Sequence, residues 1–144
     1  MQRLNLYSAV KTQTHQITKH ILHAITHIRT RIRYPYALPS DIGKALGLSL
    51  PDNLLYLALL ESLSTIHHPQ SLEKFMTRKR AENCFCGATR CEKFTLSTLC
   101  SYRFTEGWVE FELQFDEHDK LRRLYLIHKE LRNQDRIEIN LKTI

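Results

Sequence analysis

The hydrophobic pattern changes its period near residue 83, and this change constrains the fold more than any other feature of the chain. Before it, apolar residues recur every three or four positions, which is typical of amphipathic helices. After it, the stretch GWVEFELQF (107–115) alternates between apolar and polar residues, which is typical of a half-buried strand. Helices followed by strands predict an α+β fold. At 144 residues the chain is expected to be one domain, with a helical part over 1–83 and a sheet part over 84–144.

About four helices are expected in the helical part, and the first is long and basic. It is predicted over residues 10–32, where apolar residues form one stripe, and the Tyr34-Pro35 step ends it because proline disfavours the helical conformation of the residue before it. A short second helix is expected to start at Ser40 and to end at Leu46, where Gly47 closes it.

Two further helices are expected to begin at prolines. Pro51 suits the first position of a helix over 51–64, which is nearly apolar all round and is therefore expected to be the central buried one. Pro69 is expected to open the fourth helix. The inward side chains of that helix are predicted to be Leu72, Phe75 and Met76, and the outward ones Lys74, Arg78, Lys79 and Arg80.

The sheet part is expected to be a four-stranded antiparallel meander on which the helices pack. The connections are short, and short connections demand antiparallel neighbours. The strand over 108–115 is predicted to be central, with its apolar face covered by the helix over 51–64. The four strands are expected at 93–104, 107–115, 120–129 and 135–141.

The net charge of +6 is concentrated in the N-terminal segment. Residues 1–40 hold six basic residues and no acidic one, whereas residues 41–144 hold fifteen of each. Such a field attracts nucleic acid, an acidic protein surface or an anionic membrane face. The function expected from this layout is that of a non-catalytic binding module for an anionic macromolecule, a nucleic acid or an acidic protein. The expected partner-binding residues are Lys19, Arg29, Arg31, Arg33, Lys74, Arg78, Lys79 and Arg80.

An alternative function uses the apolar stripe of the first helix rather than its charge. A helix of about 23 residues extends ~35 Å, which is longer than a small domain needs. The chain would then be an adaptor or chaperone-like protein that forms homo-oligomers through this seam. The seam residues are Ile17, Ile21, Ile28 and Ile32. Steep salt dependence would favour phosphate contacts, and weak salt dependence would favour the seam.

The four cysteines follow the spacing C-x-C-x4-C-x8-C. Four thiolates can hold zinc, but zinc sites normally contain two C-x2-C pairs. Cys84, Cys86, Cys91 and Cys100 are therefore weak candidates for metal ligands, and no metal is expected. Reduced thiols are expected instead, although oxidation could join Cys91 to Cys84 or to Cys86.

No catalytic motif is visible, so the chain is expected to be no enzyme and to need no cofactor. It has neither a phosphate-cradling glycine loop nor a nucleophile elbow. Glu110 and Glu112 share a strand face and are expected to pair with Arg122 or Arg123. The histidines of the first helix are expected on its solvated flank. No apolar run approaches the ~20 residues of a membrane span, no signal peptide is apparent, and a cytoplasmic location is expected.

Overall fold

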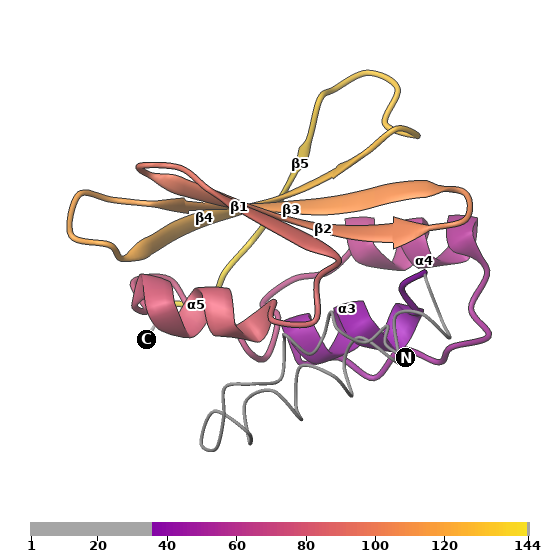
Figure 1. Cartoon of the computed structure of the whole chain (residues 1–144), viewed down its shortest axis with the longest axis horizontal. Helices are drawn as coiled ribbons and strands as arrows, with labels where there is room; N and C mark the ends of the chain where they lie inside the picture. The colour runs from indigo at the N-terminus through magenta and orange to yellow at the C-terminus, as the bar shows by residue number, and fades with distance from the viewer. Residues whose placement is uncertain (1–35, 144) are drawn as a thin grey trace, which may run out of the picture. The chain divides into compact units, whose positions relative to one another are not determined.

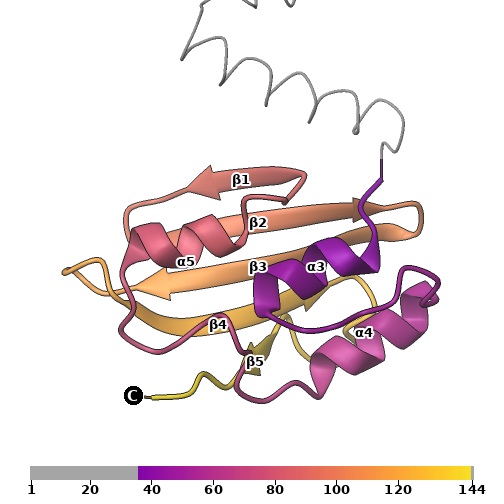
Figure 2. The same ribbon diagram turned by 90° about the horizontal axis from the view of Figure 1, so that it is seen from below.

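The computed structural model describes residues 36–143, and these form an α+β unit with three helices and a five-stranded antiparallel sheet. The α+β prediction is confirmed. The helices lie on one side of the sheet, as Figures 1 and 2 show. The predicted first helix over 10–32 lies outside the described residues. The elements are α3 (Pro39–Leu46), α4 (Tyr56–Ser64), α5 (Arg78–Cys84), β1 (Arg90–Lys93), β2 (Ser97–Phe104), β3 (Gly107–Phe115), β4 (Leu121–His128) and β5 (Ile137–Ile139).

The sheet is a meander in the order β1-β2-β3-β4-β5, so β3 is central as predicted. The alternating burial expected along β3 is confirmed: Val109, Phe111 and Leu113 are fully buried and Phe115 is nearly so. Phe85, which follows α5, packs its ring 5.5 Å from that of Phe111. Alternation along β3 therefore turns one face of the sheet toward the helices and leaves the polar residues on the other.

The predicted strand over 93–104 is in fact the end of β1, a tight turn and β2, which gives five strands instead of four. Phe94 N–H donates to the carbonyl of Ser97 at 2.8 Å, closing a two-residue loop. That loop, Thr95-Leu96, lacks the Gly, Asn or Asp that normally signals a hairpin turn. Alternation along one continuous strand would place Phe94 and Leu96 on the same face as the buried Cys100, but the turn leaves both exposed.

Helix α3 matches its prediction within one residue, because its signals are local. Pro39 occupies the first turn, and the Asp41 carboxylate accepts a hydrogen bond from Leu38 N–H at 2.8 Å. Gly47 follows the helix with φ 73°, a left-handed conformation that glycine adopts without strain.

Helix α4 begins at Tyr56, five residues after the predicted start at Pro51. Asp52, in the loop before the helix, accepts a hydrogen bond from Ser40 N–H at 3.0 Å, which ties this loop to α3. The helix is also not buried all round. Leu55 and Leu57 are 77% and 66% exposed, whereas Leu59 and Leu63 are fully buried in the core.

The predicted helix from Pro69 is wrong over its first nine residues. This segment forms turns and isolated bridges rather than a helix, and its backbone bonds to residues beside β4 and β5: Lys74 N–H donates to Lys142 O and Phe75 N–H to Leu121 O. Leu72 and Met76 are buried as predicted, but Phe75 is exposed and has φ 74°. Helix α5 starts only at Arg78, after Thr77, whose side chain accepts from Arg80 N–H.

Among the described residues, no helix is long and apolar enough to cross a membrane.

Candidate functional site

The eight basic residues predicted to bind a partner are divided between the two parts of the chain. The oligomer-seam isoleucines and four of these basic residues lie outside the described part: Ile17, Ile21, Ile28, Ile32, Lys19, Arg29, Arg31 and Arg33. The remaining four are in and before α5. Lys79 and Arg80 are exposed, and neither forms an ion pair with another described residue. Lys74 is half-buried in a turn before α5.

Arg78, by contrast, has its guanidinium bound inside the fold. Its Nε donates to Glu82 Oε2 at 3.0 Å. Its terminal nitrogens donate to the carbonyl oxygens of Phe94, Thr95 and Ser97 at 2.7–3.0 Å. A planar guanidinium suits such convergent acceptors because its donors have a fixed geometry. Arg78 therefore fastens α5 to the turn between β1 and β2.

Glu82 is the acidic partner in the same network. Its carboxylate accepts from the Thr98 hydroxyl, and it pairs with Arg78 at 3.0 Å and with Lys93 Nζ at 3.3 Å. Burial raises the pKa of Glu82, but the hydrogen bonds from Thr98, Arg78 and Lys93 outweigh burial and hold the pKa below its ordinary value. Glu82 is therefore an ionised carboxylate, held in place by the positive charges of Arg78 and Lys93.

A pair of cysteines lies beside this network. Cys91 on β1 is directly opposite Cys100 on β2, and their Sγ atoms are 3.3 Å apart. Cys100 is fully buried, whereas Cys91 is exposed. The hydrogen bond from Cys100 lowers the pKa of Cys91 to about 7. The same hydrogen bond, together with burial, raises the pKa of Cys100. Of the two thiols, the exposed Cys91 therefore loses its proton first, near neutral pH, while the buried Cys100 stays protonated.

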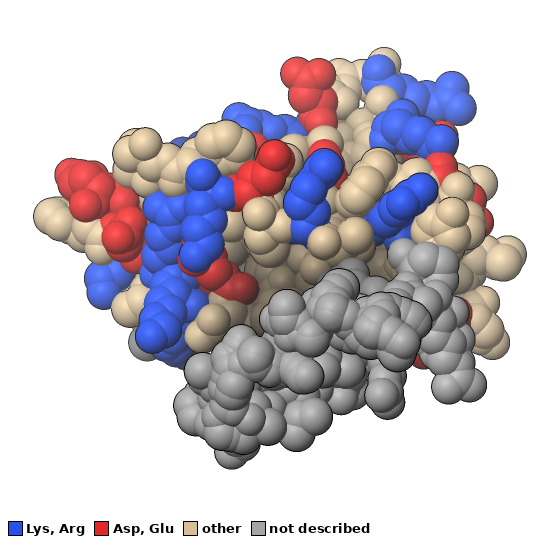
Figure 3. Space-filling view, in the orientation of Figure 1, with Lys and Arg blue, Asp and Glu red and all other residues tan. Residues whose placement is uncertain are grey.

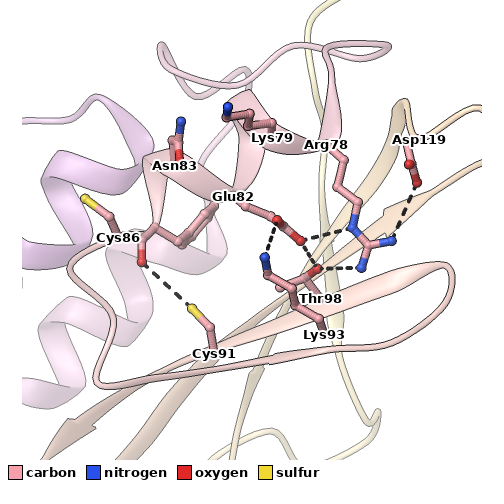
Figure 4. A pocket seen from close by; sticks show the side chains of 10 residues that line it. Arg78, Lys79, Glu82, Asn83, Cys86, Cys91, Lys93, Thr98 and Asp119 are labelled. Atoms are coloured by element: carbon pink, nitrogen blue, oxygen red, sulfur yellow. Dashed lines mark hydrogen bonds and ion pairs between the residues drawn. The ribbon is translucent and has the colours of Figure 1, made fainter.

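The other two cysteines have different surroundings. Cys84 Sγ lies 3.4 Å from Arg80 O and 3.7 Å from Ser71 O, and burial raises its pKa. Cys86 is exposed, and Figure 4 shows its side chain directed away from Cys91. The structure thus pairs Cys91 with Cys100 rather than with either cysteine suggested by the spacing.

The Cys91 thiol and the Arg78–Glu82 network line one cavity of about 630 Å³ between α5 and the β1–β2 hairpin (Figure 4). Its walls hold cations, anions and thiols together, so it suits a polar guest that can react with sulfur. No cluster of three or more His, Cys, Asp or Glu side chains in residues 36–143 is arranged to hold a metal ion. The lining residues are Arg78, Lys79, Glu82, Asn83, Phe85, Cys86, Cys91, Lys93, Thr98 and Asp119.

The sheet face away from the helices carries arginines stacked on aromatic rings. Arg90 lies 4.8 Å from the Trp108 ring centroid and Arg136 lies 3.8 Å from that of Tyr125. Beside Trp108 is a second cavity of about 500 Å³. The rings hold these guanidinium groups in place without neutralising their charge.

The glutamates of this face do not pair with the arginines expected from the sequence. Glu110 accepts from Ser101 at 2.9 Å, and Glu112 pairs with Arg136 at 3.0 Å. Arg122 pairs instead with Asp116 at 3.4 Å. The predicted partners were chosen within the β3–β4 hairpin, whereas the actual ones come from β2 and from the loop before β5.

No protein-family model matches the chain, and no match is found among curated proteins or solved structures.

Sequence reasoning missed the pairing of Cys91 with Cys100. Treating 93–104 as one strand left Cys91 outside the sheet and Cys100 without a cross-strand neighbour. The available signal was the central position of Thr95-Leu96 between the two cysteines, which a hairpin turn there would bring face to face.

Proposed function

We propose that this chain is a non-catalytic binding module that engages an anionic macromolecule, a nucleic acid or an acidic protein surface, through its basic N-terminal segment. The observation that carries the proposal is the segregation of charge. Six basic residues and no acidic one occupy residues 1–40, while the remainder of the chain is balanced at fifteen of each. A local excess of one sign raises the concentration of oppositely charged partners near it.

Helix α5 supports the proposal from within the folded unit. Lys79 and Arg80 are exposed on it and form no ion pair with other described residues. On the face shown in Figure 3, basic side chains gather over the region of α5 and β1, with acidic side chains among them. Arg78 contributes to such a surface by positioning α5, since its own donors are occupied.

The test is the salt dependence of binding to defined polyanions. Labelled single-stranded RNA, duplex DNA and polyglutamate are titrated with the full chain at several salt concentrations, and anisotropy gives the Kd. Each phosphate contact contributes about 0.7–0.9 to the slope of log K against log salt. Replacing Arg29, Arg31 and Arg33 with glutamine should therefore reduce the slope for nucleic acid by about 2–3.

A matched control removes the same charge from the folded unit. Lys44, Lys129 and Arg132 are exposed, and none forms an ion pair within residues 36–143. Their replacement by glutamine should leave the slope nearly unchanged. Equal effects of the two triple variants would mean that only net charge matters, and unchanged binding by the first would refute the proposal. Preference for polyglutamate over both nucleic acids would identify an acidic protein as the partner.

A second candidate function, protein–protein interaction, is favoured by one apolar surface. Leu55 and Leu57 are largely exposed at the start of α4, and Leu38 and Leu55 line a cavity of about 300 Å³. Large exposed apolar groups gathered in this way are typical of contact surfaces. If they join two copies of the chain, light scattering should show a mass that rises with concentration and is insensitive to salt. Leu57→Glu should then keep the chain monomeric.

A further inference from the structure

The position of Cys91 and Cys100 in the hairpin brings their backbones unusually close. Phe94 N–H donates to Ser97 O, so residues 94 and 97 are a hydrogen-bonded pair. Hydrogen-bonded and non-hydrogen-bonded pairs alternate along an antiparallel ladder. Cys91 and Cys100 lie three pairs further along and are therefore a non-hydrogen-bonded pair, whose Cα atoms are typically ~4.5 Å apart. Disulfides span Cα separations of ~4.4–6.8 Å.

The two sulfur atoms need only a short movement to form a bond. They are 3.3 Å apart with both thiols reduced, and a disulfide requires ~2.05 Å. Cys91 belongs to the edge strand β1, whose four residues are all exposed, so its side chain has room to rotate. Cys100 is fixed in the core. The pair therefore has one mobile, accessible sulfur and one held in place behind it.

We propose that Cys91 and Cys100 form a thiol–disulfide exchange site, in which Cys91 attacks a low-molecular-weight disulfide that enters the cavity and Cys100 completes an internal disulfide. This site is independent of the binding function proposed above. The oxidant is a small disulfide of the class of oxidised glutathione.

The reaction proceeds in two exchanges that balance. The Cys91 thiolate attacks one sulfur of the small disulfide, forming a mixed disulfide and releasing one small thiolate. Cys100 then attacks Cys91 Sγ, which forms the Cys91–Cys100 bond and releases the second small thiolate. The Cys100 proton leaves with that thiolate or passes to solvent. The protein thiols lose two electrons in total, and the small disulfide gains them.

The cavity fits such an oxidant in size and charge. It measures about 630 Å³ and opens beside Cys91. Lys93 and Glu82 neutralise each other within it, whereas Lys79 has no ion-pair partner among the described residues and is available to a guest carboxylate. Asp119 is the acidic group at the opposite side, 3.6 Å from Arg78. The thiolate form of Cys91, favoured by its pKa of about 7, is the nucleophile that exchange needs.

Tryptic peptides identify the bond that forms. Trypsin cleaves after Arg90, Lys93 and Arg103, so Cys91 and Cys100 fall on separate peptides, 91–93 and 94–103. Cys84 and Cys86 both fall on peptide 81–90. The full chain is incubated with oxidised glutathione, remaining thiols are blocked, and the digest is analysed without reduction. The expected product is peptide 91–93 linked to peptide 94–103.

Single variants separate the two roles. Cys100→Ser should accumulate the mixed disulfide on Cys91, because the second exchange is lost. Cys91→Ser should be modified at least tenfold more slowly at residue 100 than the wild type is at residue 91. The double variant Cys84→Ser, Cys86→Ser is the matched control and should form the internal disulfide at the wild-type rate. Urea unfolding of each variant confirms that it is folded before the exchange is measured.

Two results would overturn the proposal. One is a link from peptide 91–93 to peptide 81–90 in the folded wild type. The other is a folded wild-type chain in which Cys91 is oxidised no faster than Cys86, since Cys91 would then be an ordinary surface thiol.

Discussion

Two phenylalanines, Phe111 and Phe94, lie in opposite environments. Phe111 is fully buried on β3 between Phe85 and Tyr102, with ring centroids at 5.5 and 6.0 Å, whereas Phe94 is 56% exposed in the β1–β2 turn. Phe111→Ala should lower the free energy of unfolding by ~3–5 kcal/mol, because it removes buried contacts and leaves a cavity. Phe94→Ala should change it by less than about 0.5 kcal/mol. Urea denaturation measures both, and equal losses would mean that the ring at 94 is also part of the core.

The Cys91 thiol has a pH dependence set by its buried neighbour. The hydrogen bond from Cys100 lowers the pKa of Cys91 to about 7, so its thiolate fraction should rise through neutral pH. The rate of alkylation by iodoacetamide at Cys91, followed by peptide mass spectrometry, should show a midpoint near that value. In Cys100→Ala the midpoint should move upward toward ~8.5, the value of a free cysteine. An unchanged midpoint would assign the low pKa to another group.

For single residues, the sequence predicts burial correctly inside a regular strand and incorrectly where the chain forms a turn. Strict alternation placed Phe111 inward correctly, because one buried face fixes the register of a strand. Phe75 was placed inward by helical spacing, yet it is exposed because it lies in a turn where its backbone has φ 74°. Phe94 was placed inward by extending a strand through what is a turn.

Arg78 connects α5 to the β1–β2 hairpin through hydrogen bonds to three carbonyl oxygens of the hairpin. Arg78→Lys retains the charge but cannot supply the fork of donors, so several of these acceptors lose their protein partners. The expected loss in the free energy of unfolding is roughly 1–3 kcal/mol. Hydrogen exchange should report faster opening of β1 and of the 94–97 turn than of β3.

Arg80→Lys is the matched control for this change. Arg80 is two residues further along α5, exposed, and in no ion pair with other described residues, so the conservative change should cost less than about 0.5 kcal/mol. If both variants are equally stable, the fastening of α5 by Arg78 does not contribute measurably to stability.

Elements with self-contained signals were predicted, and elements defined by distant partners were not. Helix α3 has its proline, its Asp41 hydrogen bond and its closing glycine within a few residues. The segment from Pro69 to Thr77 has a helical pattern too, but it forms turns whose backbone bonds to partners between residues 120 and 142, far away in sequence. Tertiary pairing overrode local propensity there.

On the scale of the whole molecule, the sequence indicates the fold class and the charge layout more directly than the candidate site. The change of hydrophobic period was sufficient for α+β, since it depends on many residues at once. The cavity beside Cys91 depends on the exact register of one short hairpin, and a shift of one residue would turn Cys91 to the other face. The number of cysteines or of basic residues in the sequence does not determine the register of that hairpin.

The charge layout itself leads to a last prediction, which concerns the histidines of the basic segment. His15, His20, His23 and His27 lie among its basic residues, and an ordinary histidine becomes charged near pH ~6.5. Affinity for the polyanion that the chain prefers should therefore rise as the pH falls from about 7.5 to about 6, and the salt slope should steepen. The variant His20→Gln, His23→Gln, His27→Gln should lose most of this pH dependence. Replacement of His67, His68 and His118, three exposed histidines of the folded unit, is the matched control and should preserve it. If the control variant loses the pH dependence instead, the anion-binding surface lies on residues 36–143 and not on the N-terminal segment.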